Sequence, residues 1–556
     1  MDMCIDKYRK GLMAGGLIFF SVFMSIPFLF PKLGFFSLFG ILPLLLMEKE
    51  ASEAGLRRFW LWHYGAFVLW NAITTFWVCN ATIGGGLFAI FANAMQMSVV
   101  FGLFRLSKKV FKGAVPYIFL AAMWIAWERA YFSAQISWPW LVLGNSFAGS
   151  VRLVQWYEYT GSLGGSLWIW AVNLGLFGIW SSIRDKKWRC FNIKAKAAAL
   201  TSLVALICLP VIISESIYHS YEEKERPLDV LIVQPNLDPY QKFQSLSQSE
   251  QTKKLLGQIE EALKDRKGEG GDFQKPLLIL APETFTNDVW VNNIEGGATF
   301  RTFQDFLQSY PNVNLLFGAA SYSYYFSEKA PSYNARKIRD SEWVESHNSA
   351  LITDRTGRSQ IFHKSKLVPG VELTPYPAFF TKVDDLLGGV MGRCVGQKEI
   401  SLLDCISYSN EGEAVDRFPI GSAICYESIY GEYCTGYIRK GAQLLTVITN
   451  DAWWGDTPGY RQHLHYASLR AIETRRSIAR CGNTGISAFI NQRGDIVSRT
   501  QWWEEAVLMG QVNLNDKMTF FVREGDIVGR VSTFVFFMLL LAMGVRFLMG
   551  KGKKLK

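Results

Sequence analysis

Leu277-Leu-Ile-Leu-Ala-Pro-Glu283 is the first of three stretches that decide the fold of the second half of the chain. The second is Phe362-His-Lys-Ser-Lys-Leu-Val-Pro-Gly-Val-Glu372, and the third is Ala423-Ile-Cys-Tyr-Glu427. Each joins a short apolar run, typical of a buried β-strand, to a reactive side chain. In chain order these side chains are the carboxylate of Glu283, the ammonium of Lys364 and the thiol of Cys425. This set predicts a covalent acyl-transfer site.

The sequence around these stretches predicts an α/β domain, because from Leu228 onward short apolar runs alternate with polar helical segments. Strands are expected at 228–234, 277–281, 314–319, 349–353, 420–424, 444–449, 486–491 and 507–512. Helices are expected at 247–264, 299–309, 429–440 and 460–480. Thr356-Gly357 and Arg493-Gly494-Asp495 predict hairpin turns.

The three reactive side chains have complementary roles in acyl transfer. Cys425 is the expected nucleophile, because a thiolate attacks acyl carbonyls well and leaves a thioester that an amine can cleave. Glu283, directly after a buried strand, is the expected general base. Lys364 would hold the oxyanion and favour the thiolate. Lys366 shares its face in an extended segment but fits the pattern less well.

The order and spacing of the three segments resemble those of the nitrilase, or carbon-nitrogen hydrolase, superfamily. This resemblance implies a four-layer αββα sandwich that carries a Glu-Lys-Cys triad. A soluble member of the superfamily would show the same segments. A membrane-tethered amide or nitrile hydrolase that uses water as acceptor is therefore an alternative function, and a receptor or transporter that only binds lipid is another.

The first half of the chain is apolar in segments long enough to cross a bilayer, which takes about 20 residues. Seven spans are expected before Leu228 and an eighth near the end of the chain. They lie at 11–30, 33–47, 59–78, 84–104, 115–132, 163–183, 197–213 and 531–549. The second is short and contains Pro43, but without it the basic loops would not alternate. The run after Lys10 lacks a cleavage site and indicates a retained first span.

Basic residues mark one side of this bundle. They precede the first span and follow the second, fourth, sixth and eighth, at positions 7–10, 49–58, 105–112, 184–196 and 551–556. The alternate short loops contain only Lys32 and Arg152. The positive-inside rule therefore predicts that both termini are cytoplasmic and that the polar domain is on the outer side.

The net charge of +10 does not indicate a nucleic-acid partner, because the basic residues sit between apolar segments rather than on one face. The cysteines show no zinc spacing, and disulfides among Cys394, Cys405, Cys434 and Cys481 are left open. His463 and His465 are interpreted as structural, because no carboxylate or cysteine lies near them at ligand spacing. The sequence predicts no metal and no other cofactor.

Further motifs resemble the bacterial apolipoprotein N-acyltransferase family. Asn450-Asp-Ala-Trp-Trp-Gly455 is similar to the family's Asn-Asp-x-Trp-Phe-Gly run, and Gln462-His463 to its Gln-His pair. Arg470-Ala-Ile-Glu473-Thr-Arg-Arg476 and Arg480-Cys-Gly-Asn483-Thr-Gly485 match two more runs. The family's Val-Pro-Phe-Gly-Glu appears here as Val368-Pro-Gly-Val-Glu372, which puts the shape of that loop in doubt. By resemblance, the active-site surround comprises Glu372, Tyr426, Glu427, Trp453 and Trp454.

The resemblance covers nearly the whole chain and implies a function. A phospholipid would be the acyl donor, and the acceptor would be the N-terminal diacylglyceryl-cysteine of a lipoprotein, acylated through a thioester acyl-enzyme in a ping-pong reaction. The protein would act in the bacterial inner membrane as a monomer, with the lipid bilayer as its surroundings. The expected domains are a bundle at 1–227, a catalytic domain at 228–525, and a last span with a basic tail at 526–556.

Overall fold

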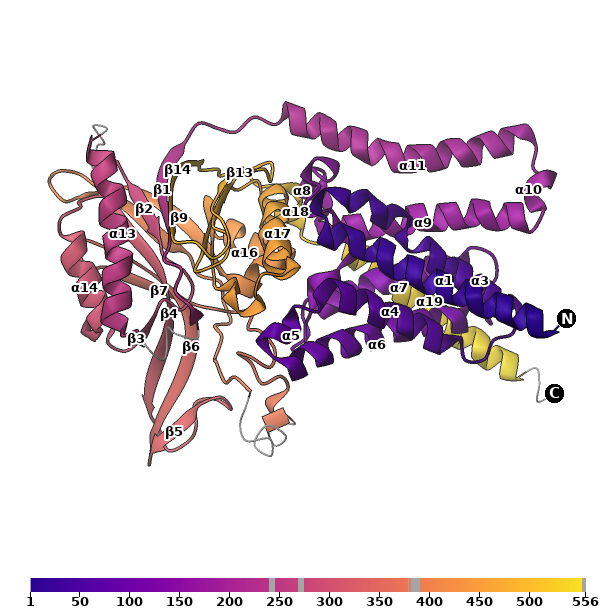
Figure 1. Cartoon of the computed structure of the whole chain (residues 1–556), viewed down its shortest axis with the longest axis horizontal. Helices are drawn as coiled ribbons and strands as arrows, with labels where there is room; N and C mark the ends of the chain where they lie inside the picture. The colour runs from indigo at the N-terminus through magenta and orange to yellow at the C-terminus, as the bar shows by residue number, and fades with distance from the viewer. Residues whose placement is uncertain (1, 240–245, 269–274, 379, 382–390, 553–556) are drawn as a thin grey trace. The chain divides into compact units, whose positions relative to one another are not determined.

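The computed structural model describes residues 2–239, 246–268, 275–378, 380–381 and 391–552. The chain divides into two compact units. One contains Met1–Tyr221 and Glu524–Lys556 and is helical, and the other contains Glu222–Arg523 and is built on β-sheets (Figure 1).

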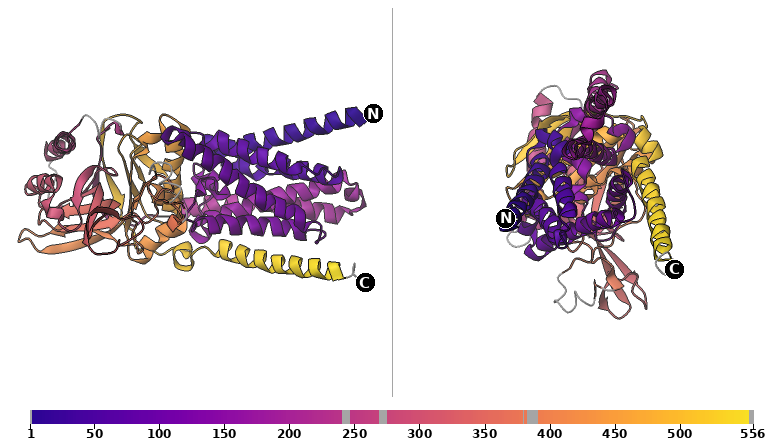
Figure 2. Two further views of the ribbon diagram at one scale, coloured as in Figure 1. Left: turned by 90° about the horizontal axis from the view of Figure 1, so that it is seen from below. Right: turned by 90° about the vertical axis from the view of Figure 1, so that its right-hand side faces the viewer.

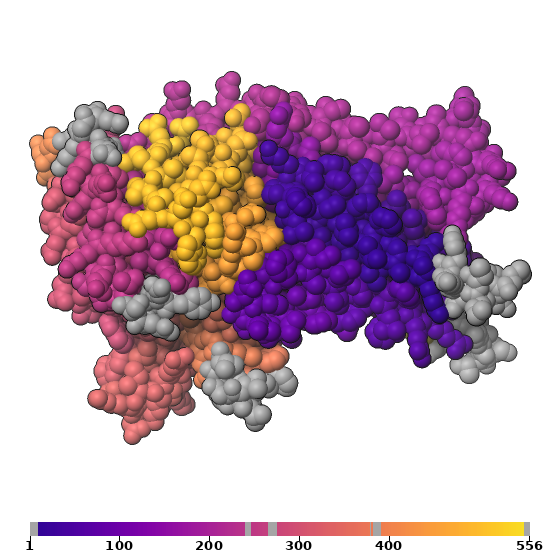
Figure 3. Space-filling model, viewed as in Figure 1, coloured from indigo at the N-terminus to yellow at the C-terminus, as the bar shows by residue number. Residues whose placement is uncertain are grey.

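The helical unit begins with a series of helices of which most are long and apolar. They are α1 (Asp2–Leu29), η1 (Pro31–Phe36), α2 (Ser37–Gly40), α3 (Leu42–Glu53), α4 (Phe59–Thr75), α5 (Val78–Ala81), α6 (Ile83–Ser107) and α7 (Val115–Tyr131). After four short turns, η2 (Pro139–Leu141), η3 (Leu143–Phe147), η4 (Val151–Leu153) and α8 (Tyr157–Thr160), come α9 (Ser162–Arg184), α10 (Lys187–Cys190), α11 (Ile193–Ser220) and the final α19 (Ile527–Gly552). Figure 2 shows the long helices of this unit running in similar directions, and in Figure 3 the early residues, coloured indigo, form a continuous surface.

Six helical segments in the described chain are long and apolar enough to cross a membrane, rather than the predicted eight. They are Arg9–Leu29, Pro31–Glu53, Ile83–Ser107, Ser162–Arg184, Ile193–Ser220 and Ile527–Met549. The predicted spans at 59–78 and 115–132 form α4 and α7, which have 17 residues each. At 1.5 Å per residue such a helix rises about 26 Å, which is less than the ~30 Å hydrocarbon core of a bilayer.

The segment Pro31–Glu53 is interrupted, and Asn173 of α9 compensates for the interruption. The Asn173 Oδ1 accepts hydrogen bonds from the backbone N–H groups of Ile41 (3.0 Å) and Leu42 (2.9 Å), and its Nδ2 donates to the Ser37 carbonyl (3.1 Å). Pro43 stands in the first turn of α3, where its missing N–H costs no helical hydrogen bond. A broken helix is tolerated in an apolar setting when side chains satisfy the freed backbone groups in this way.

The α/β unit contains two sheets. The first has the order β14-β1-β2-β4-β6-β5, with β3 paired to β4 and β7 paired to β6, and the second has the order β13-β12-β11-β10-β9-β8. The strands of the first sheet are β1 (Pro227–Gln234), β2 (Leu277–Leu280), β3 (Thr286–Trp290), β4 (Val313–Phe326), β5 (Arg336–Arg339), β6 (Glu342–Asp354), β7 (Ser359–His363) and β14 (Ala506–Asn513). Those of the second are β8 (Leu403–Tyr408), β9 (Ala414–Ile424), β10 (Leu444–Thr449), β11 (Ile478–Gly482), β12 (Ala488–Ile490) and β13 (Ile496–Arg499).

The two sheets pack face to face, and helices cover their outer faces. One buried cluster joins side chains of both sheets, such as Ile232 and Ile448, to residues of α16 (Gly431–Arg439) and α17 (Pro458–Thr474). A second cluster joins the other face of the first sheet to α13 (Gln248–Gly268) and α14 (Ala298–Leu307). In Figure 1, α13 and α14 lie on one side of the sheets, and α16 and α17 lie on the other. This layering is the αββα order that the resemblance implied.

All eight predicted strands are present, and both predicted turns form hairpins with glycines at positive φ, Gly357 at 81° and Gly494 at 86°. Six further strands, β3, β5, β7, β8, β11 and β13, were missed. The helix predicted at 460–480 was wrong at its end, because α17 stops at Thr474 and Arg475 takes a left-handed conformation (φ 49°). The following residues enter the second sheet as β11, between β10 and β12.

Candidate active site

Glu283 lies just beyond β2, in a position that β4 holds tightly. The chain turns at Thr284, which has φ 47°, and a Cβ atom on Gly318 of β4 would lie 2.5 Å from the Glu283 Cα. Only glycine therefore fits at position 318. Glu283 is buried, and its Oε2 accepts the backbone N–H of Asn450 (3.0 Å).

Lys364 follows β7 and is 1% exposed. Its Nζ lies 3.1 Å from Glu283 Oε1 and 2.9 Å from Glu372 Oε1, so one ammonium bridges two carboxylates. Burial alone would lower the pKa of Lys364, but these two carboxylates outweigh burial and hold that pKa well above its usual value. The side chain is therefore a fixed positive charge at neutral pH.

Cys425 stands at the turn between β9 and the short 3-10 helix η6 (Cys425–Ile429). Its φ of 49° is unusual for a residue with a side chain and makes the strand-to-helix turn sharp. The backbone carbonyl of Cys425 accepts a hydrogen bond from Ser428 Oγ (2.8 Å) and lies 3.1 Å from His463 Nε2. A strained residue held by its surroundings in this way is common at functional sites.

The surroundings of Cys425 favour its protonated thiol over the thiolate. Burial, and then the negative charge of Glu283, raise the pKa of Cys425 well above its usual value, and Lys364 only partly opposes them. Lys364 lowers the pKa of Cys425, but burial and Glu283 raise that pKa by more, so Lys364 alone does not make the thiolate the favoured form. A base must therefore remove the Cys425 proton before the sulfur can attack.

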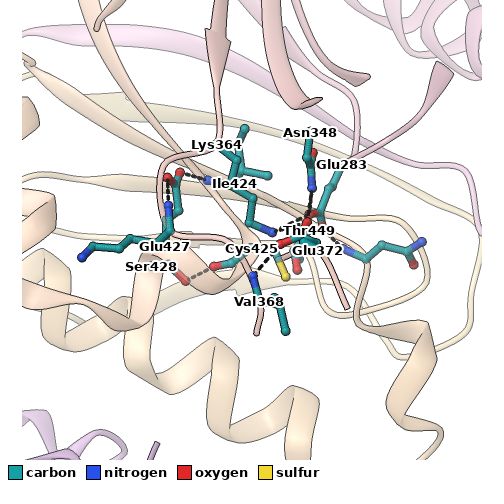
Figure 4. Close-up of polar contacts among 12 residues, drawn as sticks. Glu283, Asn348, Lys364, Val368, Glu372, Ile424, Cys425, Glu427, Ser428 and Thr449 are labelled. Atoms are coloured by element: carbon teal, nitrogen blue, oxygen red, sulfur yellow. Dashed lines mark hydrogen bonds and ion pairs between the residues drawn. The ribbon is translucent and has the colours of Figure 1, made fainter. Parts of the chain in front are cut away.

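The structure brings Glu283, Lys364, Glu372 and Cys425 into one cluster, although they come from three separate segments (Figure 4). Lys364 is the lysine that bridges the two carboxylates. Lys366 points elsewhere, with its Nζ 5.2 Å from the ring centre of Tyr430. The Val368–Glu372 loop, whose shape the sequence left in doubt, brings Glu372 to Lys364, with Glu372 Oε2 accepting the Val368 N–H (2.8 Å).

Glu427 ties the nucleophile turn to the lysine segment. Its Oε1 accepts the N–H groups of Ser365 (2.7 Å) and Lys366 (3.1 Å), and its Oε2 accepts the Ile424 N–H (2.9 Å). The hydroxyl of Tyr433 also donates to Oε1 (2.8 Å). Burial raises the pKa of Glu427, and these hydrogen bonds oppose that rise. Glu427 therefore fixes the backbone on both sides of the cluster.

The aromatic residues of the predicted surround lie in neighbouring turns. Tyr426 is buried, with its ring centre 5.3 Å from that of Tyr430. Trp453 and Trp454 are partly buried in the 3-10 helix η7 (Asp451–Trp454), which begins directly after Asn450. The ring centre of Trp454 lies 5.5 Å from that of His463.

A polar network that contacts the backbone of Cys425 was not predicted from the sequence. His463 Nδ1 lies 3.0 Å from Asp451 Oδ1, and Arg480 Nη2 donates to Asp451 Oδ2 (2.5 Å). Burial would raise the pKa of Asp451, but Arg480 and His463 lower it, so Asp451 is a charged partner.

The sequence predicted no carboxylate or cysteine near His463, and this prediction was wrong. Ligand atoms of Cys425, Asp451 and His463 lie within 4.8 Å of one another, because β9, η7 and α17 meet here. The hydrogen bonds of Asp451 and His463 to Arg480 and to the Cys425 carbonyl make this cluster a scaffold for the nucleophile turn. The thiols of Cys394, Cys405, Cys434 and Cys481 are all free.

Two family models match the chain in separate regions. The apolipoprotein N-acyltransferase N-terminal domain matches residues 20–175, and the carbon-nitrogen hydrolase model matches residues 278–517. The apolipoprotein N-acyltransferase of Chlorobaculum tepidum is 28% identical over 511 residues, which are 91% of each chain. That of Geobacter metallireducens is 27% identical over 477 residues, covering 84% of this chain and 81% of its own.

The two models together with these relatives support an apolipoprotein N-acyltransferase with a nitrilase-superfamily domain. The α/β unit is accordingly a nitrilase-superfamily domain, and the protein is an N-acyltransferase. Several apolar helices together with these matches indicate a protein of the inner membrane.

Proposed function

We propose that this N-acyltransferase moves an acyl chain from a phospholipid to the α-amine of the N-terminal diacylglyceryl-cysteine of a lipoprotein, through a thioester on Cys425. The observation that carries the proposal is the buried cluster in which Lys364 bridges Glu283 and Glu372 beside Cys425. A charged lysine, a carboxylate and a thiol are the groups that covalent acyl transfer requires.

In the first half-reaction, Glu283 removes the Sγ proton of Cys425, and the thiolate attacks the ester carbonyl of the phospholipid. Lys364 and a backbone N–H of the nucleophile turn stabilise the tetrahedral oxyanion. Collapse of this intermediate breaks the ester C–O bond, and Glu283 returns the proton to the departing lysophospholipid oxygen. The raised pKa of Cys425 supports this role, since the thiol does not ionise without a base.

In the second half-reaction, the α-amine of the acceptor attacks the thioester carbonyl and gives up one proton through Glu283. The C–S bond breaks, the amide remains on the acceptor, and Cys425 regains its proton. Glu372 shares the Lys364 ammonium and so fixes its position. We assign Trp453, Trp454 and Tyr426 to the apolar wall that meets the lipid chains, and Glu427 to holding the turn.

We further propose eight spans, with α4 and α7 crossing as short, tilt-free helices, both termini in the cytoplasm and the α/β domain outside. The domains would be 1–227, 228–525 and 526–556, and the protein would act as a monomer. The alternation of basic loops along the sequence supports this topology. A compartment-specific reporter fused after Gln248 is expected to be active only outside the cytoplasm, and activity only inside would overturn the topology.

The rival function, hydrolysis with water as acceptor, makes a different prediction about the acyl-enzyme. A transferase is expected to keep its acyl group until an amine arrives, because premature hydrolysis would waste the donor. Purified protein loaded from a phospholipid should therefore release its acyl group at least about tenfold faster with a diacylglyceryl-cysteinyl peptide than with buffer. An N-acetylated form of the same peptide is the matched control, and equal release with all three would favour the hydrolase.

A further inference from the structure

Asn348 of β6 lies at the centre of the carboxylate cluster, although no sequence motif singled it out. Its Nδ2 donates one hydrogen bond to Glu283 Oε1 (2.7 Å) and another to Glu372 Oε1 (2.7 Å). Its backbone carbonyl accepts the Lys364 N–H (2.8 Å), which fixes the start of the lysine segment against β6. Figure 4 shows Asn348 of β6 and Lys364, which follows β7, reaching the two carboxylates.

The four carboxylate oxygens of Glu283 and Glu372 all receive donors. The two Oε1 atoms share Lys364 Nζ and Asn348 Nδ2, and the two Oε2 atoms accept the N–H groups of Asn450 and Val368. Two carboxylates that reach the same two nitrogens repel each other, and such pairs commonly retain one proton between them. Each carboxylate here receives N–H donors from Lys364, Asn348 and the backbone, and such donors stabilise the charged form of a carboxyl group.

The orientation of the Asn348 amide follows from its neighbours. Both contacts are to carboxylate oxygens, so the NH₂ group must face them, because the carbonyl oxygen would only repel them. The Asn348 Oδ1 is then left buried without a hydrogen-bond partner among the described residues. An unpaired buried oxygen destabilises a fold. The position therefore keeps an amide at a cost in stability, which indicates that its two donors serve the site.

We propose that Asn348 is a positioning residue that keeps both carboxylates ionised, so that Glu283 is free to accept a proton. Lys364 provides the charge that the pair needs, and Asn348 provides one N–H to each carboxylate without adding charge. This inference rests on the proposed role of Glu283 as the base. Without Asn348, each carboxylate would lose one N–H donor, and, on this proposal, a proton bound between the two carboxylates would then compete with the role of Glu283 as base.

Several titratable side chains interact electrostatically with this cluster. Lys364 interacts with Glu283, Glu372 and Cys425; Cys394 interacts with Glu372; and Asp451 interacts with Cys425. His347 and His363 flank Asn348 and Lys364 in sequence, and their rings stack at 4.2 Å. Because side chains alternate along a strand, these histidines point to the opposite face of the β6–β7 hairpin.

The decisive variants are Asn348→Leu and Asn348→Asp, with Asn314→Leu as the matched control. Asn314 of β4 is also a buried asparagine. In the described part of the chain its side-chain amide exchanges hydrogen bonds only with the backbone of Ile406, at 2.8 and 2.9 Å. The rate of acyl-enzyme formation is measured from pH 5 to 9. In a plot of this rate against pH, the rise on the acid side is expected to shift to higher pH by about one unit or more in Asn348→Leu. The rate at neutral pH would then be roughly tenfold lower than in the wild type, and it would recover at high pH.

Asn348→Asp should shift the acid side of the rate profile to still higher pH, because it adds a third carboxyl group. Asn314→Leu should lower the thermal midpoint without shifting the acid side of the profile. An equal loss at every pH in Asn348→Leu, or an unshifted acid side, would overturn the proposal.

A second readout separates this proposal from the proposed function. The infrared spectrum of Asn348→Leu at neutral pH is expected to contain a protonated-carboxyl band that the wild type lacks and that Glu372→Gln removes. If the wild type formed no acyl-enzyme at any pH, the proposed function would fail, and the band would still test Asn348. Absence of the band from Asn348→Leu would overturn the role of Asn348 alone.

Discussion

Replacing Cys425 with alanine is expected to lower the rate of acyl transfer by at least about 1,000-fold, because it removes the sulfur that carries the acyl group in the proposed intermediate. The protein should stay folded, since the change removes one sulfur atom and keeps the backbone of the turn. The Ser428 and His463 hydrogen bonds go to the backbone carbonyl and remain available. Transfer from a fluorescent phospholipid to a diacylglyceryl-cysteinyl peptide measures the loss.

Cys405→Ala is the matched control for this change. Cys405 is a fully buried free thiol of β8, so its removal should lower stability a little and leave transfer largely intact. Cys425→Ser distinguishes the nucleophile from a packing role, because the hydroxyl is nearly isosteric but far less nucleophilic. Substantial transfer by Cys425→Ala would show that the acyl group never resides on this sulfur.

Replacing Lys364 with methionine is expected to damage both activity and folding. Its ammonium lies between two buried carboxylates, and breaking a buried ion pair by removing one partner costs about 3–5 kcal/mol. Loss of an oxyanion stabiliser should lower the transfer rate by a further factor of about 100–1,000 in the protein that remains folded. Thermal unfolding in detergent and the peptide assay measure the two effects.

Lys366→Met is the control, because Lys366 Nζ lies over the Tyr430 ring rather than between the carboxylates. The pH dependence gives a further check. The pKa of Lys364 is raised in the folded protein, so its contribution to stability is fully present below the unfolded value of about 10.4 and is lost only as pH rises through the folded value. The stability difference between wild type and Lys364→Met should therefore stay constant from pH 7 to 9. A difference that disappeared over this interval would contradict a charged, paired Lys364.

That Glu283 and Cys425 lie close together was predictable because each follows an apolar run, whereas Lys364 follows β7, a strand that the sequence prediction missed. Glu283 and Cys425 are positioned by β2 and β9, whose apolar runs are clear in the sequence. Asn348 was missed because an asparagine inside a strand carries no local signal. Its contact with Glu283 depends on the pairing of β6 with β4, which only the folded sheet reveals.

Other features were hidden for similar reasons. Asp451 and His463 are separated from Cys425 by 26 and 38 positions, and only the meeting of β9, η7 and α17 brings them together. The positive φ of Cys425 has no signature in residue type, since glycine would be expected there. The helix expected up to Arg480 was ended by the left-handed Arg475, because the buried strand β11 must enter the sheet.

The most direct test is intact mass spectrometry of the detergent-purified protein after incubation with one defined phospholipid, beside Cys425→Ala. A mass increase of one acyl chain is predicted for the wild type only, released by hydroxylamine as a thioester would be. The same increase in Cys425→Ala, or no adduct in the wild type while free fatty acid accumulates, would contradict a stable acyl-enzyme on Cys425.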